Sequence, residues 1–214
     1  DCGSNVAKPV PFPPKRQSRQ GFPTVEKEEP MKRILTVVAV STALLPAVAA
    51  LASAQMFQIY DGVDAVRKQV DTDDGFEHNL AAEYRRFTLY EADDMADWID
   101  AEHFAEKTLA SARGETVPPE NLADWKLGDA QLPALQSSRA RLISAFDRDS
   151  RILAPHASAR AQAQFDCWVE QAEEGHQTED IAACRTGFLN AMLEIDAKLD
   201  AWDNERIEQE YPAK

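Results

Sequence analysis

Apolar side chains recur at a helical period from residue 76 onward. In the first stretch Phe76, Leu80, Tyr84 and Phe87 share one face, and Glu91 takes the next position of the same stripe. A spacing of three and four residues predicts an amphipathic helix whose apolar face is buried. We therefore expect this helix to supply part of a hydrophobic core.

A second helix is predicted from about residue 96 to residue 112. Its inner face is expected to carry Trp98, Ala101, Phe104, Ala105 and Leu109. Gly114 is typical of the position that follows a helix C-terminus. The two helices form a hairpin that resembles one tetratricopeptide-type (TPR-like) helix pair, although no second copy follows at the required period.

The segment 116–133 (TVPPENLADWKLGDAQLP) separates this hairpin from three further helices. Its prolines and glycine disfavour a helix, and we expect Leu122 and Trp125 to hold it against the core. The further helices are predicted at about 134–150, at 155–174 and from 178 onward. Pro155 suits the first turn of the middle one, and Thr178 is the expected N-cap of the last.

The last helix has the most regular stripe in the chain. Its apolar positions are Ile181, Cys184, Phe188, Met192, Ile195, Leu199 and Trp202. This heptad-like repeat favours packing against a neighbouring helix, and Pro212 is expected to end it. Strand patterns are almost absent after residue 55. We predict an all-α domain of about five helices in antiparallel hairpins over residues 76–210, preceded by a linker over residues 55–75.

The first 54 residues have a different composition. Residues 31–54 begin with a basic Met-Lys-Arg, continue as an apolar run and end in Ala-Ser-Ala. This order is typical of a secretory signal peptide, with cleavage between Ala54 and Gln55. Residues 1–30 are interpreted as a disordered or mis-called upstream segment. An uncleaved membrane anchor is the alternative, and both interpretations export everything after residue 55.

The exported part is strongly acidic. Residues 55–214 carry 16 Lys and Arg against 33 Asp and Glu, a net charge of −17. Such a surface repels nucleic acids and anionic lipids, so neither is an expected partner. The acidic residues are spread along the chain, which favours solvated helix faces over a single acidic site.

Two acidic stretches resemble cation-binding motifs. Residues 93–97 (DDMAD) match the D-D-x-x-D pattern of prenyl-transfer enzymes, but no second cluster faces them in the sequence. Residues 71–75 (DTDDG) lack the glycine and glutamate positions of an EF-hand loop. We interpret the first as an acidic turn with capping Asp residues and the second as a helix N-terminus. We predict no metal, no cofactor and no catalytic residue.

The stretch FDCWVEQAEEGHQTEDIAACRTGF contains Cys167 and Cys184, with His176 near its midpoint. A zinc site would require short paired spacings, and a redox pair is usually C-x-x-C. The two cysteines lie at equal distances from a turn at Gly175 and His176, so antiparallel helices would bring them level. Because the exported compartment is oxidising, we predict a structural disulfide between Cys167 and Cys184, with His176 as a turn residue.

This stretch resembles the helical N-terminal region of alphaproteobacterial proteins of the outer membrane protein A (OmpA) family. The resemblance extends upstream through LAAEYRRFTLYEADDMADWIDAEHFAEKTLASARGETVPPENLADW and covers about residues 76–195. Members usually continue into a C-terminal domain that binds peptidoglycan, whereas this chain stops at Lys214 before such a domain. The resemblance implies an envelope protein of the periplasm, associated with the outer membrane, in a Gram-negative bacterium. It assigns no peptidoglycan ligand to any residue here.

These observations lead to two expected functions. The first is a non-enzymatic periplasmic spacer or docking module of an OmpA-family protein. Its partners would be envelope proteins and, through a C-terminal domain outside this chain, peptidoglycan. The alternative is a free-standing periplasmic helical adaptor that binds a protein partner through the TPR-like hairpin. A third hypothesis is an enzyme that uses a metal held by the acidic residues 93–100.

Overall fold

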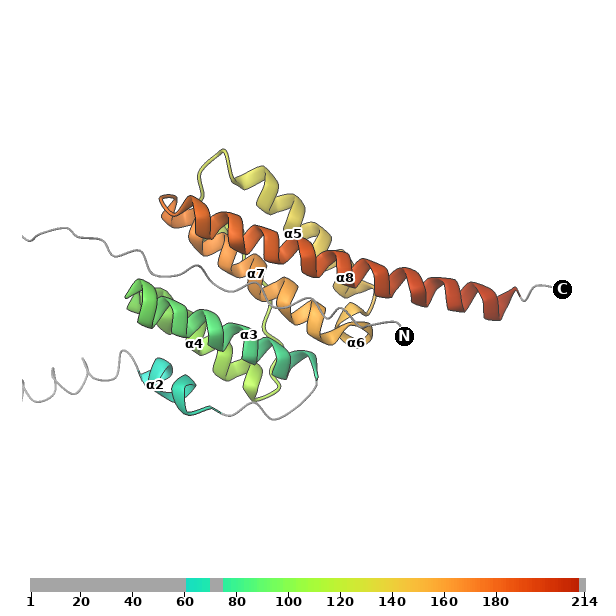
Figure 1. The fold of residues 1–214 in the computed structure, drawn as a ribbon, viewed down its shortest axis with the longest axis horizontal. Helices are drawn as coiled ribbons and strands as arrows, with labels where there is room; N and C mark the ends of the chain where they lie inside the picture. The colour runs from blue at the N-terminus through green and yellow to red at the C-terminus, as the bar shows by residue number, and fades with distance from the viewer. Residues whose placement is uncertain (1–60, 70–74, 212–214) are drawn as a thin grey trace, which may run out of the picture. The chain divides into compact units, whose positions relative to one another are not determined.

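The computed structural model describes residues 61–69 and 75–211, and all regular structure in these residues is helical (Figure 1). The elements are α2 (Asp61–Lys68), α3 (Phe76–Tyr90), the π-helical turn η1 (Glu91–Met95), α4 (Trp98–Ala112), the 3₁₀ turn η2 (Leu122–Asp124), α5 (Leu132–Asp147), α6 (Ser150–Leu153), α7 (Pro155–Glu174) and α8 (Thr178–Glu210). The predicted all-α fold is confirmed, since the five expected helices correspond to α3, α4, α5, α7 and α8. The predicted signal peptide at 31–54, with its cleavage site at Ala54 and Gln55, lies outside the described residues.

α7 is the central helix of this arrangement. It packs against α3, α5, α6 and α8, and its buried residues occur on every side of the helix rather than along one stripe. Many of them are alanines, which leave room for neighbouring helices to approach closely. Pro155 begins the helix, as the sequence predicts, because its missing N–H has no partner to lose at that position.

The aromatic stripe of α3 is buried as predicted. Phe76, Leu80, Tyr84 and Phe87 are each at most 4% exposed. The rings of Phe87 and Phe104 of α4 meet edge to face, with centroids 4.5 Å apart. Such aromatic pairs stabilise a helix contact beyond the area that they bury.

α4 begins two residues later than predicted. Ala96 adopts a left-handed conformation with φ 60°, and Asp97 caps the helix by accepting hydrogen bonds from the amides of Ile99 and Asp100. Trp98, expected on the inner face, is therefore the first helical residue, and it is 39% exposed. At the other end the chain leaves the helix through Gly114, which has the positive φ expected there.

The linker predicted for residues 55–75 contains the helix α2. Val63 and Val66 are fully buried in a small cluster with alanines of α4. The carboxylate of Glu102 accepts hydrogen bonds from the amides of Gly62 and Val63, at 3.0 and 3.1 Å. The helix has only eight residues, too few for a helical period to stand out in the sequence. Much of its stability comes from α4.

The segment between α4 and α5 packs on the core through Leu122 and Trp125, as predicted. The turn between α7 and α8 passes through Gly175, whose φ of 72° is readily adopted by glycine. Thr178 is not the N-cap of α8. It is the first helical residue, and Gln177 precedes it without a side-chain capping bond.

α8 has 33 residues, which corresponds to a length of about 50 Å. Its stripe is buried from Ile181 to Leu199, but Trp202, expected at the end of that stripe, is 49% exposed. Figure 1 shows the reason, since α8 continues past the ends of α6 and α7. The apolar period persists in the sequence after the partner helix has ended.

Candidate functional site

A stripe of polar residues runs along the central helix. Ser158, Gln162, Asp166 and Glu170 follow one another at intervals of four, and each is at most 1% exposed. Residues at this spacing lie on the same side of a helix. Buried polar groups require hydrogen-bond partners. This stripe therefore leads to the polar clusters in the interior of the protein.

Asp166 belongs to a first group, the lysine cluster, defined as Lys107, Glu120, Asp166 and Tyr84. The Lys107 ammonium lies 2.7 Å from Asp166 Oδ2 and 2.5 Å from Glu120 Oε1. The Tyr84 hydroxyl donates to Asp166 Oδ2 at 2.5 Å, and the Glu120 amide donates to Asp166 Oδ1 at 2.8 Å. The cluster joins α3, α4, α7 and the segment that follows α4.

Further polar contacts hold that segment at Glu120. His103 lies with Nε2 at 2.8 Å from Glu120 Oε1, and the Trp125 indole donates to Glu120 Oε2 at 2.9 Å. Arg139 of α5 donates from Nε to the carbonyl oxygen of Glu120 at 2.7 Å. Gln162 of α7 donates to the carbonyl oxygen of Val117 at 2.8 Å. A segment with little helix is thereby tied to three helices.

Lys107 and Glu120 stabilise each other's charges in the lysine cluster, whereas burial raises the pKa of Asp166 despite the neighbouring charge of Lys107. Burial raises the pKa of Glu120, but hydrogen bonds from His103 and Lys107 together with the lysine charge outweigh it and lower the pKa to about 2. Burial lowers the pKa of Lys107, and the carboxylates of Asp166 and Glu120 reverse this, so the net shift is upward. A lysine that stays protonated is a poor nucleophile, and this geometry suits a structural tie.

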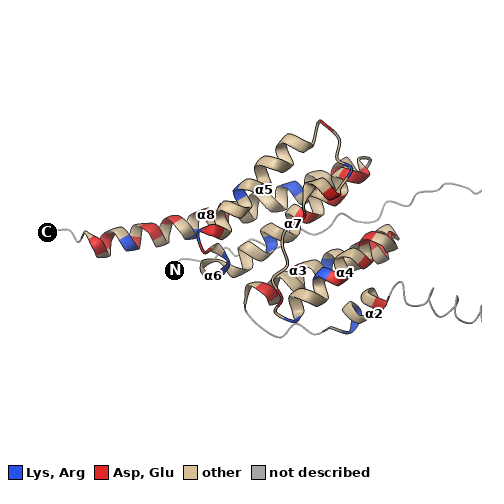
Figure 2. Ribbon diagram, turned by 180° about the vertical axis from the view of Figure 1, so that it is seen from behind, with Lys and Arg blue, Asp and Glu red and all other residues tan. Residues whose placement is uncertain are grey.

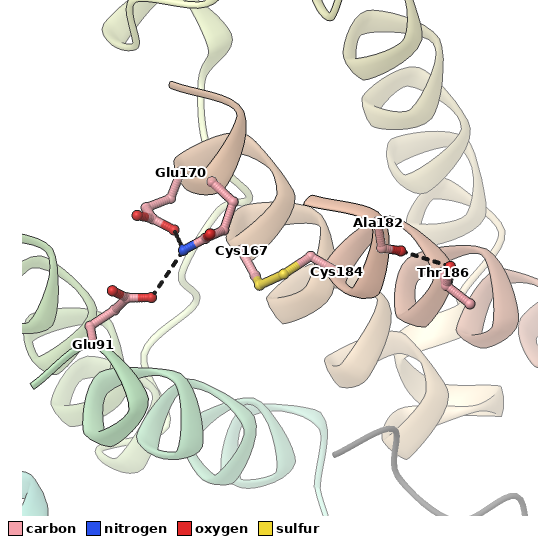
Figure 3. Close-up of a disulfide and its surroundings, with 7 residues drawn as sticks. Glu91, Cys167, Glu170, Ala182, Cys184 and Thr186 are labelled. Carbon is pink, nitrogen blue, oxygen red and sulfur yellow. Dashed lines mark hydrogen bonds between the residues drawn. A yellow bond between two sulfur atoms is a disulfide. The ribbon is translucent and has the colours of Figure 1, made fainter. Parts of the chain in front are cut away.

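The second group, the acidic cluster, is formed by Glu91, Glu170 and Gln171 (Figure 3). Gln171 Nε2 donates to Glu170 Oε2 at 2.8 Å and to Glu91 Oε1 at 3.3 Å. Glu91 Oε2, Glu170 Oε1 and Gln171 Oε1 are buried without a hydrogen-bond partner among the described residues. The cluster connects the start of η1 with α7.

Burial and like charge act in the same direction on these two carboxyl groups. Burial, followed by the charges of Glu174 and Asp100, raises the pKa of Glu91 to about 9. Burial, followed by the charge of Glu91, raises the pKa of Glu170 to about 10. Perturbed carboxyl groups of this kind are concentrated at functional sites in proteins, and so are π-helical turns such as η1.

The predicted disulfide is present. Cys167 and Cys184 are bonded, with their Cα atoms 5.8 Å apart, and they join α7 to α8 (Figure 3). Trp168 and Phe165 lie beside it, and both rings contact Phe188 of α8. His176 lies exposed in the turn, as expected.

The D-D-x-x-D residues do not converge. Asp93 forms an ion pair with Arg67 of α2, at 2.6 Å, whereas Asp97 caps α4. No group of three or more His, Cys, Asp or Glu side chains in residues 61–69 and 75–211 is arranged to hold a metal ion. The interpretation of this motif as an acidic turn with a capping Asp is confirmed. Figure 2 shows acidic residues on several helices and not in a single cluster.

Sequence reasoning missed both polar clusters. Glu91 was visible only as the polar exception in the α3 stripe, and Asp166 stands between the apolar Phe165 and the cysteine Cys167. The usable signal was the four-residue interval of polar positions in α7, which is unusual in a helix otherwise rich in alanine and aromatic residues. Glu120 gave no periodic signal because it lies outside any helix.

Comparisons with known proteins give no relative for this chain. No family model, no curated protein and no solved structure matches it. None of the helices in the described ranges is both long and apolar enough to cross a membrane. The resemblance to the helical region of OmpA-family proteins therefore stays a prediction.

Proposed function

We propose that this chain is an exported, non-enzymatic helical module that acts as a spacer or docking element in the bacterial envelope, as part of an OmpA-type outer membrane or peptidoglycan-associated protein. The observation that carries the proposal is the end of α8. Leu199 is the last buried residue of this helix, and residues 200–210 continue as a helix with almost every side chain exposed. A helix that extends beyond its own core offers a surface to another molecule.

The exposed end of α8 has the composition of a docking surface. Trp202, Ile207 and Tyr211 are 49%, 55% and 71% exposed, and aromatic side chains are enriched at protein interfaces. Acidic residues alternate with them along the helix. This combination favours a protein partner over an anionic lipid surface, because like charges repel.

The disulfide supports export. Structural disulfides form and persist in oxidising compartments and are rare in the cytosol. Both cysteines are at most 3% exposed, so the bond is part of the folded interior and not a surface redox pair. The resemblance to OmpA-family proteins points to the same compartment.

Cell fractionation tests the location. The complete chain and a variant lacking residues 31–54 are expressed in a Gram-negative host, and their thiols are alkylated before and after reduction. We expect the complete chain in the envelope or periplasmic fraction with Cys167 and Cys184 oxidised, and the shortened chain in the cytosol with both cysteines free. Finding the complete chain in the cytosol with free thiols would contradict the proposal.

Photo-crosslinking in living cells tests the docking surface. A crosslinking residue is placed at Ile207 on the end of α8, and at the exposed Ile152 of α6 as a matched control. We expect adducts with envelope proteins from position 207 and not from position 152. Adducts equally frequent at both positions would contradict a specific role for α8.

A second candidate is the free-standing adaptor that uses the hairpin of α3 and α4. It is favoured by Ile99, which is 80% exposed at the start of α4. A crosslinker at position 99 separates the two candidates in the same experiment, since the adaptor predicts adducts there and the α8 surface does not.

A further inference from the structure

We propose that Glu91 and Glu170 form a proton-binding site, in which the two carboxyl groups hold at least one proton between them at neutral pH and thereby join η1 to α7. Glu91 and Glu170 are 79 positions apart in the sequence. Both side chains are almost completely buried. Glu91 is 0% exposed and Glu170 is 1% exposed. The proposal goes beyond the docking function and does not depend on it.

Among the described residues, each carboxyl group of the site has one oxygen that accepts a hydrogen bond and one that does not. The amide nitrogen of Gln171 has two hydrogens, and it donates to one oxygen of each carboxyl group. The second oxygen of each group has no donor among residues 61–69 and 75–211. In Figure 3 these two remaining oxygens point to the same side, away from the dashed hydrogen bonds. A proton on either group would turn that carboxylate, which can only accept, into a group that can also donate.

The two carboxyl groups differ from the lysine cluster in their charge compensation. In the described ranges no Lys, Arg or His forms an ion pair with Glu91 or Glu170, in contrast to the lysine cluster, where Lys107 bridges Glu120 and Asp166. Burying two ionised carboxylates without a cation is strongly unfavourable, because each loses its hydration without gaining a partner. A proton bound to one carboxyl group removes the cost of that charge and its repulsion from the other carboxylate, and a proton requires no coordination cage.

The neighbouring helices add mostly negative charge. The titratable groups around the pair are Asp97 and Asp100 at the start of α4, Glu174 in α7, Asp180 in α8 and Tyr90 in α3. The charge of His103 acts to lower the pKa of Asp100, and the charge of His176 acts to lower that of Glu174. Burial followed by these carboxylates raises the pKa of Glu91 to about 9 and, with Glu91 itself, that of Glu170 to about 10. The electrostatics therefore agree with the geometry.

The site links stability to pH with a definite sign. An unfolded glutamate titrates near pH 4.3, so the folded chain binds more protons than the unfolded chain between that pH and the raised values. Stability must then fall as pH rises through this range, and the unfolding constant grows by up to about tenfold per pH unit for each proton lost. Above the raised values both groups are ionised in either state and the dependence ends.

Infrared spectroscopy and urea unfolding test the site directly, on the wild type and on Glu91→Gln, Glu170→Gln and, as a matched control, the exposed Glu106→Gln. At pH 7 we expect the wild type and the control to show a carbonyl band of a protonated carboxylic acid. The band should be weaker or absent in the two site variants. Between pH 7 and pH 10 the unfolding constant of the wild type should rise at least tenfold more than that of either site variant.

Three results would overturn the proposal. The first is a wild type without a protonated carboxyl band at pH 7. The second is a pH dependence between pH 7 and pH 10 that all four proteins share. The third is displacement of the band at pH 7 by added magnesium, calcium or zinc, which would make the pair a metal site. If a site variant fails to fold, the infrared band of the wild type is followed from pH 7 to pH 10. The proposal requires that this band weaken as the pH rises.

Discussion

The buried ionisable residues of this protein differ in whether an oppositely charged side chain lies next to them. Lys107 is 11% exposed at its side chain and lies between two carboxylates that are at most 9% exposed. Removing one member of a buried ion network leaves the others without compensation, which costs more than the contact itself contributes. Lys107 is thus the residue on which the lysine cluster depends.

We expect Lys107→Met to lower the free energy of unfolding by about 3–5 kcal/mol, because Glu120 and Asp166 would remain buried without the Lys107 ammonium between them. Urea denaturation at pH 7 measures the change. The exposed Lys198→Met serves as the control and should change stability by less than about 0.5 kcal/mol. Similar losses in the two variants would show that the lysine cluster does not contribute more than a surface charge.

Elements were predicted best where burial follows a simple period. The long stripes of α3 and α8 predicted both helices, since each buries one face along most of its length. The period placed Glu91 in the α3 stripe, but it could not predict its partners Glu170 and Gln171, because they come from a distant helix. The predicted bounds of the last two helices indicated that the α8 stripe extends beyond α7, but they did not fix Leu199 as the last buried residue.

The same helices lead to a prediction about the disulfide. Reducing the bond, or replacing Cys167 and Cys184 by serine, should lower the free energy of unfolding by about 3 kcal/mol, because the bond closes a loop of 17 residues. Thermal unfolding with and without a reductant measures the effect. The reductant should not affect the serine variant, and a reductant effect of equal size in both proteins would contradict this explanation.

The end of α8 should contribute little to stability. Ending the chain after Leu199 removes exposed side chains and the surface ion pair of Asp203 with Arg148, and such pairs contribute at most about 1 kcal/mol. We expect a loss below about 1 kcal/mol in urea denaturation. A loss above about 3 kcal/mol would mean that this part belongs to the core and would weaken its assignment as a docking surface.

The stability of the whole molecule depends on pH through two clusters whose glutamates have pKa values shifted in opposite directions. The acidic cluster favours the folded state at low pH. Glu120 has its pKa lowered to about 2, so its contribution is complete above about pH 4.5 and is lost as the pH falls towards 2. Stability should therefore decline on both sides of a maximum in the weakly acidic range.

Glu120→Gln tests the acid side of this profile. The variant should be less stable than the wild type at pH 6, because the contacts of the carboxylate with Lys107 and His103 are lost. Between pH 4.5 and pH 2 it should lose about 2–3 kcal/mol less stability than the wild type. Chemical denaturation across this range measures both. Parallel curves would contradict the lowered pKa of Glu120.

The disulfide also has a consequence for the chain before it folds. A bond between Cys167 and Cys184 keeps the α7 and α8 sequences close to each other even when no helix is present. The central helix and its longest partner then need not search for each other, and the entropy of closing that loop is already lost in the denatured ensemble. Oxidation thereby shortens the effective sequence separation of the core contacts, and protein chains with more local contacts fold faster.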